Sequence, residues 1–250
     1  MKKYVPNALT LLNLLSGCIA VILAVNNHFV AAALFVFIGV FFDFFDGFAA
    51  RKLNVQSELG LQLDSLADVV TSGVVPGIIM FKLLGLSIGS GESFSFSEGW
   101  GTDFYGVTYS VSITAFFGLA ITLASAYRLA KFNIDEEQQT YFKGLPTPAN
   151  ALLIISLPLI IEFQNSDAIN HIILNKWFLI GLTILSCYLL NSNIKLFALK
   201  FKDFSFKNNA TRYIFIILCI VLLIVLQFAS IPIIILLYIV MSVLDNLTSK

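Results

Sequence analysis

Eight apolar stretches, each long enough to cross a lipid bilayer as a helix, constrain the fold of this chain more than any other feature. A bilayer core of about 30 Å needs roughly 20 apolar residues per helix. Only 12% of the 250 residues are charged, against about 25% in a soluble globular protein. We therefore predict an all-α, polytopic membrane helix bundle. The expected spans lie near residues 7–25, 29–50, 57–84, 107–132, 145–163, 175–193, 211–228 and 231–247.

The positions of the lysines and arginines predict how this bundle is oriented. Loops on the cytoplasmic side of membrane proteins carry an excess of these residues. With the N-terminus inside, every Lys and Arg except Lys82 and Lys176 falls on the cytoplasmic side. We therefore expect an integral protein of a bacterial inner membrane with a cytoplasmic N-terminus. The net charge of zero excludes a polybasic nucleic-acid binder, so no nucleic-acid partner is expected.

Four aspartates stand out because acidic side chains in membrane helices are rare unless they serve a function. Asp43 and Asp46 are three residues apart, and Asp64 and Asp68 are four apart, so each pair shares a helix face. The two helices are joined by a short cytoplasmic turn, which can bring the pairs together at the cytoplasmic ends of the second and third spans. Such converging carboxylates cannot all stay ionised without cations.

Metal binding resolves that conflict of charge. Ligation by oxygen alone, without His or Cys, favours Mg²⁺ or Mn²⁺ over zinc. Four carboxylates can hold two such ions, and paired ions suit an in-line displacement at phosphorus. Gly47 and Gly60 remove side chains one turn from Asp43 and Asp64, which lets a bulky group approach the backbone. Arg51 can grip phosphate oxygens bidentately. These features predict a site for a metal-bound diphosphate.

Three other interpretations of the acids are open. They could pair with basic residues between helices, although only Arg51 and Lys52 are near in sequence. They could form the ion pathway of a divalent-cation transporter, but this function needs acids at mid-membrane depth. The chain could also be a catalytically silent membrane scaffold.

The stretch from Asp43 to Asp68 resembles the signature of the CDP-alcohol phosphatidyltransferase family, Asp-x2-Asp-Gly-x2-Ala-Arg-x8-Gly-x3-Asp-x3-Asp. All of its fixed positions are present, as Asp43, Asp46, Gly47, Ala50, Arg51, Gly60, Asp64 and Asp68. The resemblance implies an integral membrane enzyme, often a homodimer, with six core helices and a cavity open to the cytoplasm. We accordingly divide the chain into a membrane core, 1–193, and a cytoplasmic connector with a C-terminal transmembrane hairpin, 194–250.

The resemblance also implies roles for single residues. Asp43, Asp46, Asp64 and Asp68 would bind the metals, and Asp68 would also act as the general base that deprotonates the attacking alcohol. Gly47, Arg51 and Ser57 match positions that contact the CDP-lipid, CDP-diacylglycerol, and we add Gly60 for the access that it gives. Pro6, Asn7 and Thr10 match a segment that lines the nucleotide pocket. CMP would leave as the alcohol oxygen attacks phosphorus.

Two further stretches, 125–133 and 141–151, together with residues 6–10, resemble the phosphatidylserine synthase branch of the family, so L-serine is the acceptor that we expect. Arg128 and Lys131 are three residues apart at the cytoplasmic end of the fourth span, where two cations could bind the carboxylate of serine. Arginine is common in this branch where Lys131 stands. The pair could equally be ordinary cytoplasmic anchors, and it would also suit the phosphate of glycerol 3-phosphate or inositol phosphate.

Overall fold

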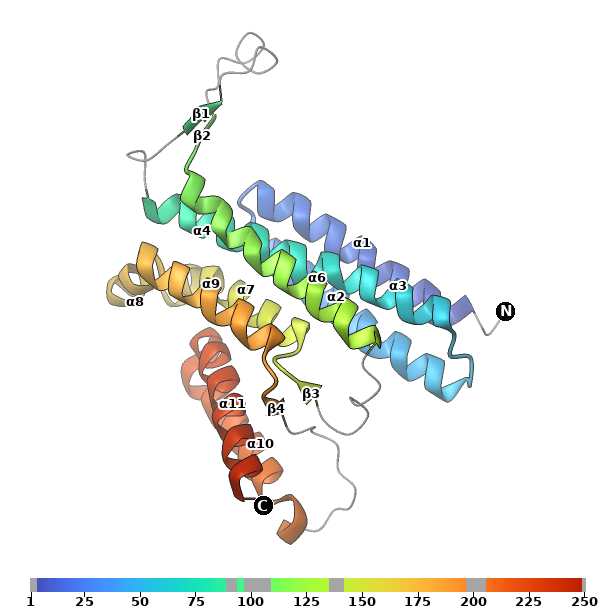
Figure 1. The fold of residues 1–250 in the computed structure, drawn as a ribbon. Coiled ribbons are helices and arrows are strands. Elements are labelled where there is room, and N and C mark those ends of the chain that lie inside the picture. Colours follow the sequence, from blue (N-terminus) through green and yellow to red (C-terminus); the bar gives the residue numbers. More distant parts are fainter. Residues whose placement is uncertain (1–3, 89–93, 97–108, 135–141, 197–205, 249–250) are drawn as a thin grey trace.

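A computed structural model describes residues 4–88, 94–96, 109–134, 142–196 and 206–248 of the chain (Figure 1). Two short antiparallel strand pairs, β1 with β2 and β3 with β4, accompany the helices. The elements are α1 Val5–Val25, α2 Phe29–Lys52, α3 Glu58–Asp68, η2 Val69–Val74, α4 Val75–Ile88, β1 Phe94–Phe96, β2 Tyr109–Val111, η4 Ile113–Leu119, α6 Ala120–Ile134, β3 Phe142–Lys143, α7 Thr147–Gln164, α8 Asp167–Ile173, α9 Lys176–Asn191, β4 Lys195–Leu196, α10 Phe206–Leu226, η6 Gln227–Ala229 and α11 Ser230–Thr248.

The predicted membrane helix bundle is confirmed, and the chain is an integral membrane protein with several helical spans. In the described residues, six helical stretches are long and apolar enough to cross a membrane, and the bent pair α8–α9 makes a seventh. The last stretch, Arg212–Asp245, turns back at η6, so α10 and α11 lie side by side (Figure 1). These two helices correspond to the last two predicted spans. The predicted start of the fourth span at 107 is wrong, because Tyr109–Val111 pairs with β1 and the helix begins at Ile113.

Small side chains bring α1 and α2 together as an antiparallel hairpin. Ala20 and Ala24 on α1, and Ala32 and Ala33 on α2, are all buried in the core. Small residues let helix backbones approach closely, which favours the van der Waals packing that helps helices associate inside a bilayer. The turn between the two helices contains Asn27 with φ 64°, a left-handed conformation that asparagine tolerates better than most residues.

A π-helix, η2, follows Asp68 directly and joins α3 to α4 within one membrane span. A π turn leaves backbone carbonyls without their usual partners, and neighbouring side chains can satisfy them. Here the Thr122 hydroxyl of α6 donates to the Gly73 carbonyl at 3.0 Å, and the Thr71 hydroxyl donates to the Asn13 carbonyl of α1 at 3.2 Å. The segment after Asp68 is therefore fastened to two other helices.

The core is centred on α7, which is the most buried of the candidate spans, whereas α10 and α11 are the least buried. Gln164 at the end of α7 secures the C-terminal hairpin. Its Nε2 donates to the Leu226 carbonyl at 2.8 Å, and its Oε1 accepts from the Ala229 backbone N–H at 3.1 Å. The rings of Phe163 and Phe228 stack beside this contact. These two hydrogen bonds of the Gln164 side-chain amide attach the turn at η6 to the bundle.

Candidate active site

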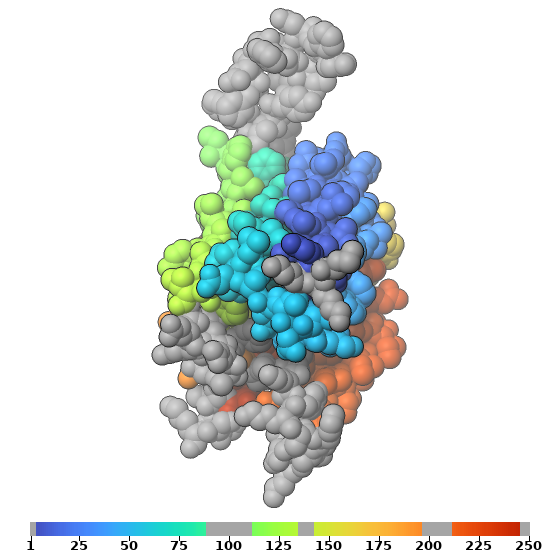
Figure 2. Space-filling view, turned by 90° about the vertical axis from the view of Figure 1, so that its right-hand side faces the viewer, coloured from blue at the N-terminus to red at the C-terminus, as the bar shows by residue number. Residues whose placement is uncertain are grey.

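The turn that connects α2 to α3 lies next to the start of α1. Asn54 adopts φ 51° in this short turn, and Ser57 then begins α3 by accepting a hydrogen bond from the Gly60 backbone N–H at 3.1 Å. A serine cap of this kind stabilises a helix N-terminus by about 1 kcal/mol. Figure 2 shows the connection, in cyan, lying against the dark blue start of α1.

Three of the four predicted metal ligands converge. One carboxylate oxygen each from Asp43, Asp64 and Asp68 lies within 4.8 Å of the others. Oδ1 of Asp64 is buried without a hydrogen-bond partner among the described residues. Buried polar atoms almost always have a partner, and clustered carboxylates need positive charge nearby. An all-oxygen donor set with an unpaired buried oxygen therefore fits a hard divalent cation such as Mg²⁺ or Mn²⁺.

Asp46 is not part of that group of three. It is buried on the side of α2 that faces α1, where it accepts a hydrogen bond at Oδ2 from the Thr10 hydroxyl. The same hydroxyl lies 3.1 Å from the Pro6 carbonyl. Because a hydroxyl has a single proton, it can serve only one of these two acceptors at a time. Asp46 thus lies beside the trio, held by α1.

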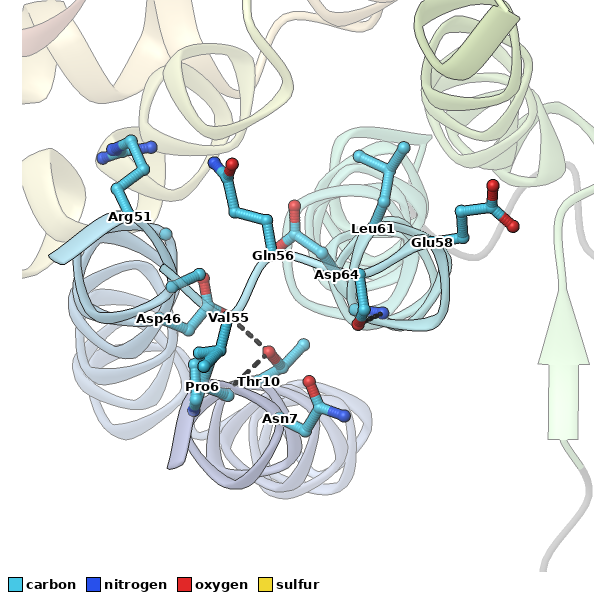
Figure 3. A pocket seen from close by; sticks show the side chains of 14 residues that line it. Pro6, Asn7, Thr10, Asp46, Arg51, Val55, Gln56, Glu58, Leu61 and Asp64 are labelled. Carbon is cyan, nitrogen blue, oxygen red and sulfur yellow. Dashed lines mark hydrogen bonds between the residues drawn. The ribbon is translucent and has the colours of Figure 1, made fainter. Parts of the chain in front are cut away.

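A cavity of about 490 Å³ opens between α1, α2 and α3 (Figure 3). It is large enough for a small-molecule ligand. Every residue predicted to contact the CDP-lipid lines it, together with Asp46 and Asp64: Pro6, Asn7, Thr10, Gly47, Arg51, Ser57 and Gly60. In the close view, the α1 side chains lie on one side of the opening, and Arg51 and Gln56 lie on the other. The helical ends thus bring all seven predicted residues to one site.

The two glycines of the cavity wall lie in places where a side chain would intrude. A Cβ on Gly47 would come 3.3 Å from the guanidinium of Arg51, and one on Gly60 would come 3.2 Å from Ser57 Oγ and 3.4 Å from Asn7 Oδ1. The contacts with Arg51 and Ser57 are both tighter than ordinary van der Waals distance. Glycine therefore leaves Arg51 and the Ser57 cap in place and keeps the backbone accessible to a ligand.

The predicted acceptor residues lie apart from this cavity. Arg128 and Lys131 line a separate pocket of only about 10 Å³, room for no more than one water, with Lys143 of β3 and with Asn191 and Ser192 at the end of α9. Lys131 is exposed, whereas Arg128 is buried and its Nε has no hydrogen-bond partner among the described residues. Arg128 and Asp68 are close enough to interact electrostatically. Arg128 thus lies between the acidic cluster and the smaller pocket.

Asn13 is a further residue of the site, beyond those predicted from the sequence. Its Nδ2 donates to Asp68 Oδ1 at 3.2 Å, and the residue is completely buried. Asn13 lies three residues after Thr10 on α1, so both side chains project from one helix face. The sequence does contain a signal for it, because Asn13 is a polar residue on the same face of a membrane helix as a predicted site residue. Its partner, Asp68, follows only from the packing of α1 against α3.

The sequence profile of CDP-alcohol phosphatidyltransferases matches residues 3–188. The chain is 32% identical over 155 residues to a CDP-diacylglycerol–serine O-phosphatidyltransferase of Bacillus subtilis, covering 62% of this chain and 75% of the relative. It is 29% identical over 182 residues to the enzyme of that name from Methanocaldococcus jannaschii, covering 73% and 71%. A relative of the same name from Saccharomyces cerevisiae is 32% identical over 170 residues, covering 62% of this chain and 53% of the relative. These matches confirm the family resemblance, and the chain belongs to the CDP-alcohol phosphatidyltransferase family.

Proposed function

We propose that this enzyme transfers the phosphatidyl group of CDP-diacylglycerol to L-serine, forming phosphatidylserine and CMP. The observation that carries this proposal is the three-carboxylate group of Asp43, Asp64 and Asp68 beside a cavity of about 490 Å³. A metal site next to a cavity large enough for a small-molecule ligand suits displacement at phosphorus. The serine O-phosphatidyltransferases among its relatives support serine as the acceptor.

The four aspartates and the residues of the cavity have different parts in this reaction. Asp43, Asp46, Asp64 and Asp68 hold two divalent ions, Mg²⁺ or Mn²⁺, which neutralise diphosphate charge when bound. The residues that line the cavity, among them Arg51, bind the CDP-lipid. Asp68 accepts the proton of the serine hydroxyl. The serine oxygen then forms a bond to the lipid-linked phosphorus, and the bond from that phosphorus to the bridging oxygen breaks. CMP leaves with the bonding electron pair.

Arg128 is suited to bind the carboxylate of serine. It is buried, it has an unpaired Nε, and it is close to Asp68, the proposed base. An arginine fork pairs with a carboxylate through two parallel hydrogen bonds. Binding there orients serine at the edge of the acidic cluster. Lys131 lines the same small pocket and adds positive charge.

We further propose that residues 1–193 form the catalytic core and that 194–250 form a connector and a C-terminal hairpin. The family match, which ends at residue 188, supports this division. The distribution of Lys and Arg supports a cytoplasmic N-terminus and active site in a bacterial cell membrane. The family resemblance supports a homodimer.

The acceptor is identified by comparing alcohols in a CMP-release assay. We expect purified protein with CDP-diacylglycerol and Mn²⁺ or Mg²⁺ to release CMP when L-serine is added. A phosphorylated acceptor is the specific alternative, because Arg128, Lys131 and Lys143 give the small pocket three cationic side chains. If CMP is released with glycerol 3-phosphate or inositol phosphate but not with serine, that alcohol is the acceptor and serine is not.

Replacing Arg128 with glutamine tests the carboxylate contact. Loss of a hydrogen bond to a charged group costs about 1.5–3 kcal/mol, so we expect the KM for serine to rise by roughly 10- to 100-fold. The KM for CDP-diacylglycerol should stay nearly constant, because Arg128 does not line the lipid cavity. The matched variant is Lys131→Gln, which removes an exposed charge from the same pocket and should have a smaller effect. Equal effects from both variants would contradict a special role for Arg128.

A further inference from the structure

One face of α1 carries two hydrogen-bond donors that each hold a different aspartate. Thr10 donates to Asp46 on α2, and Asn13 donates to Asp68 at the end of α3 at 3.2 Å. Both donors come from the first span, and their acceptors lie on the second and third spans. α1 therefore connects the two acid-bearing helices. The two residues are one helical turn apart, which places their Cβ atoms about 5–6 Å from each other.

Asn13 is held in place by its surroundings. Thr71 in the π-helix donates to the Asn13 carbonyl at 3.2 Å, which fixes the backbone at this point. On the other side, Gly39 of α2 leaves the space that the Asn13 side chain fills, since a Cβ there would lie 2.8 Å from Asn13 Oδ1. The amide is fully buried between three segments. A residue so confined presents its donor to Asp68 in one direction.

We propose that Asn13 is a positioning residue for Asp68. Its hydrogen bond keeps the Asp68 carboxylate beside the other metal ligands and within reach of the attacking hydroxyl. The inference rests on the proposed function, in which Asp68 is both ligand and base. Since a carboxylate only accepts hydrogen bonds, the amide nitrogen occupies one oxygen of Asp68 and fixes the plane of the group. Residues that hydrogen-bond to metal ligands commonly contribute a factor of 10 to 100 to metal affinity or to activity.

The proposal is tested with Asn13→Leu, which keeps nearly the same volume but removes the donor, and with Asn13→Ala should the leucine variant not fold. Mn²⁺ alone is titrated into metal-free, monodisperse protein, and the free ion is followed by electron paramagnetic resonance. We expect the variant to bind Mn²⁺ about 10- to 100-fold more weakly. In the CMP-release assay kcat should fall by a similar factor, while the KM for CDP-diacylglycerol changes less than about threefold.

Ser16→Ala is the matched control. Ser16 is buried on the same helix, but its hydroxyl donates only to the Leu12 carbonyl within α1. This variant should bind Mn²⁺ as the parent protein does. Asn13 variants that are less stable yet bind Mn²⁺ with the parent affinity would overturn the inference and leave the proposed function standing. A parent protein that binds no Mn²⁺ would overturn both, because the carboxylates would then not be metal ligands.

Discussion

Replacing Asp68 with asparagine is expected to lower the rate of CMP release by about 10²–10⁴-fold, the usual contribution of a general base. The variant keeps the size of the side chain and an oxygen that can face the metal, but its amide cannot take the proton of the serine hydroxyl. Binding of CDP-diacylglycerol should survive, since Asp68 does not line the lipid cavity. Single-turnover CMP release and equilibrium binding of the CDP-lipid measure the two quantities separately.

The control for this substitution is Glu162→Gln, which changes an exposed carboxylate on α7 and should leave the rate unchanged. A variant at Asp68 that turns over at the parent rate would exclude Asp68 as the base and move that role to another carboxylate. A variant that neither binds lipid nor turns over would indicate that Asp68 acts mainly as a ligand.

Removing the divalent metal is expected to abolish CMP release. Asp43, Asp64 and Asp68 place carboxylate oxygens within 4.8 Å of one another, and such a cluster is strongly repulsive without a cation. Treatment with EDTA should reduce CMP release to background, and added Mg²⁺ or Mn²⁺ should restore it. EDTA already saturated with Mg²⁺ is the control and should have no effect. Activity that persists after complete chelation, checked by metal analysis, would contradict the proposed metal site.

A measurement of metal flux distinguishes the enzyme from a divalent-cation transporter. A transporter would move Mn²⁺ into liposomes without any nucleotide substrate, whereas the enzyme should show no such flux and should need CDP-diacylglycerol for any metal-dependent reaction. The proposed acids lie in the half of each span that is nearer the turn between α2 and α3, whereas an ion pathway needs acids at mid-membrane depth. Metal flux without CMP release would therefore replace the catalytic interpretation.

Local spacing was sufficient to predict much of this site. Asp43 and Asp64 are close because two helices with acids at defined positions are joined by a short turn, and both features are visible in the sequence. The seven predicted lipid-contact residues line one cavity for the same reason. The apolar stretches predicted the helices well, except at Tyr109–Val111, where a strand pairs with a partner more than ten residues away.

The contacts of α1 could not be predicted in this way. Two hydrogen bonds depend on how α1 is rotated about its axis against α2 and α3. They are the bonds from Thr10 to Asp46 and from Asn13 to Asp68. That rotation is determined by close packing, such as the contact of Gly39 with Asn13, and not by any sequence spacing. The separation of Asp46 from the other three acids follows from the same packing, because Thr10 draws its carboxylate toward α1.

The π-helix after Asp68 lets one membrane span serve two different environments. An extra residue in a turn rotates everything that follows by about 100° relative to an unbroken α-helix. Before η2, the helix presents Asp64 and Asp68 to the acidic cluster; after it, α4 presents Ile79, Met80 and Leu83 to the apolar core. Deleting one residue of η2 would bring these two faces out of alignment, so a single helix could no longer both carry the carboxylates and pack in the core.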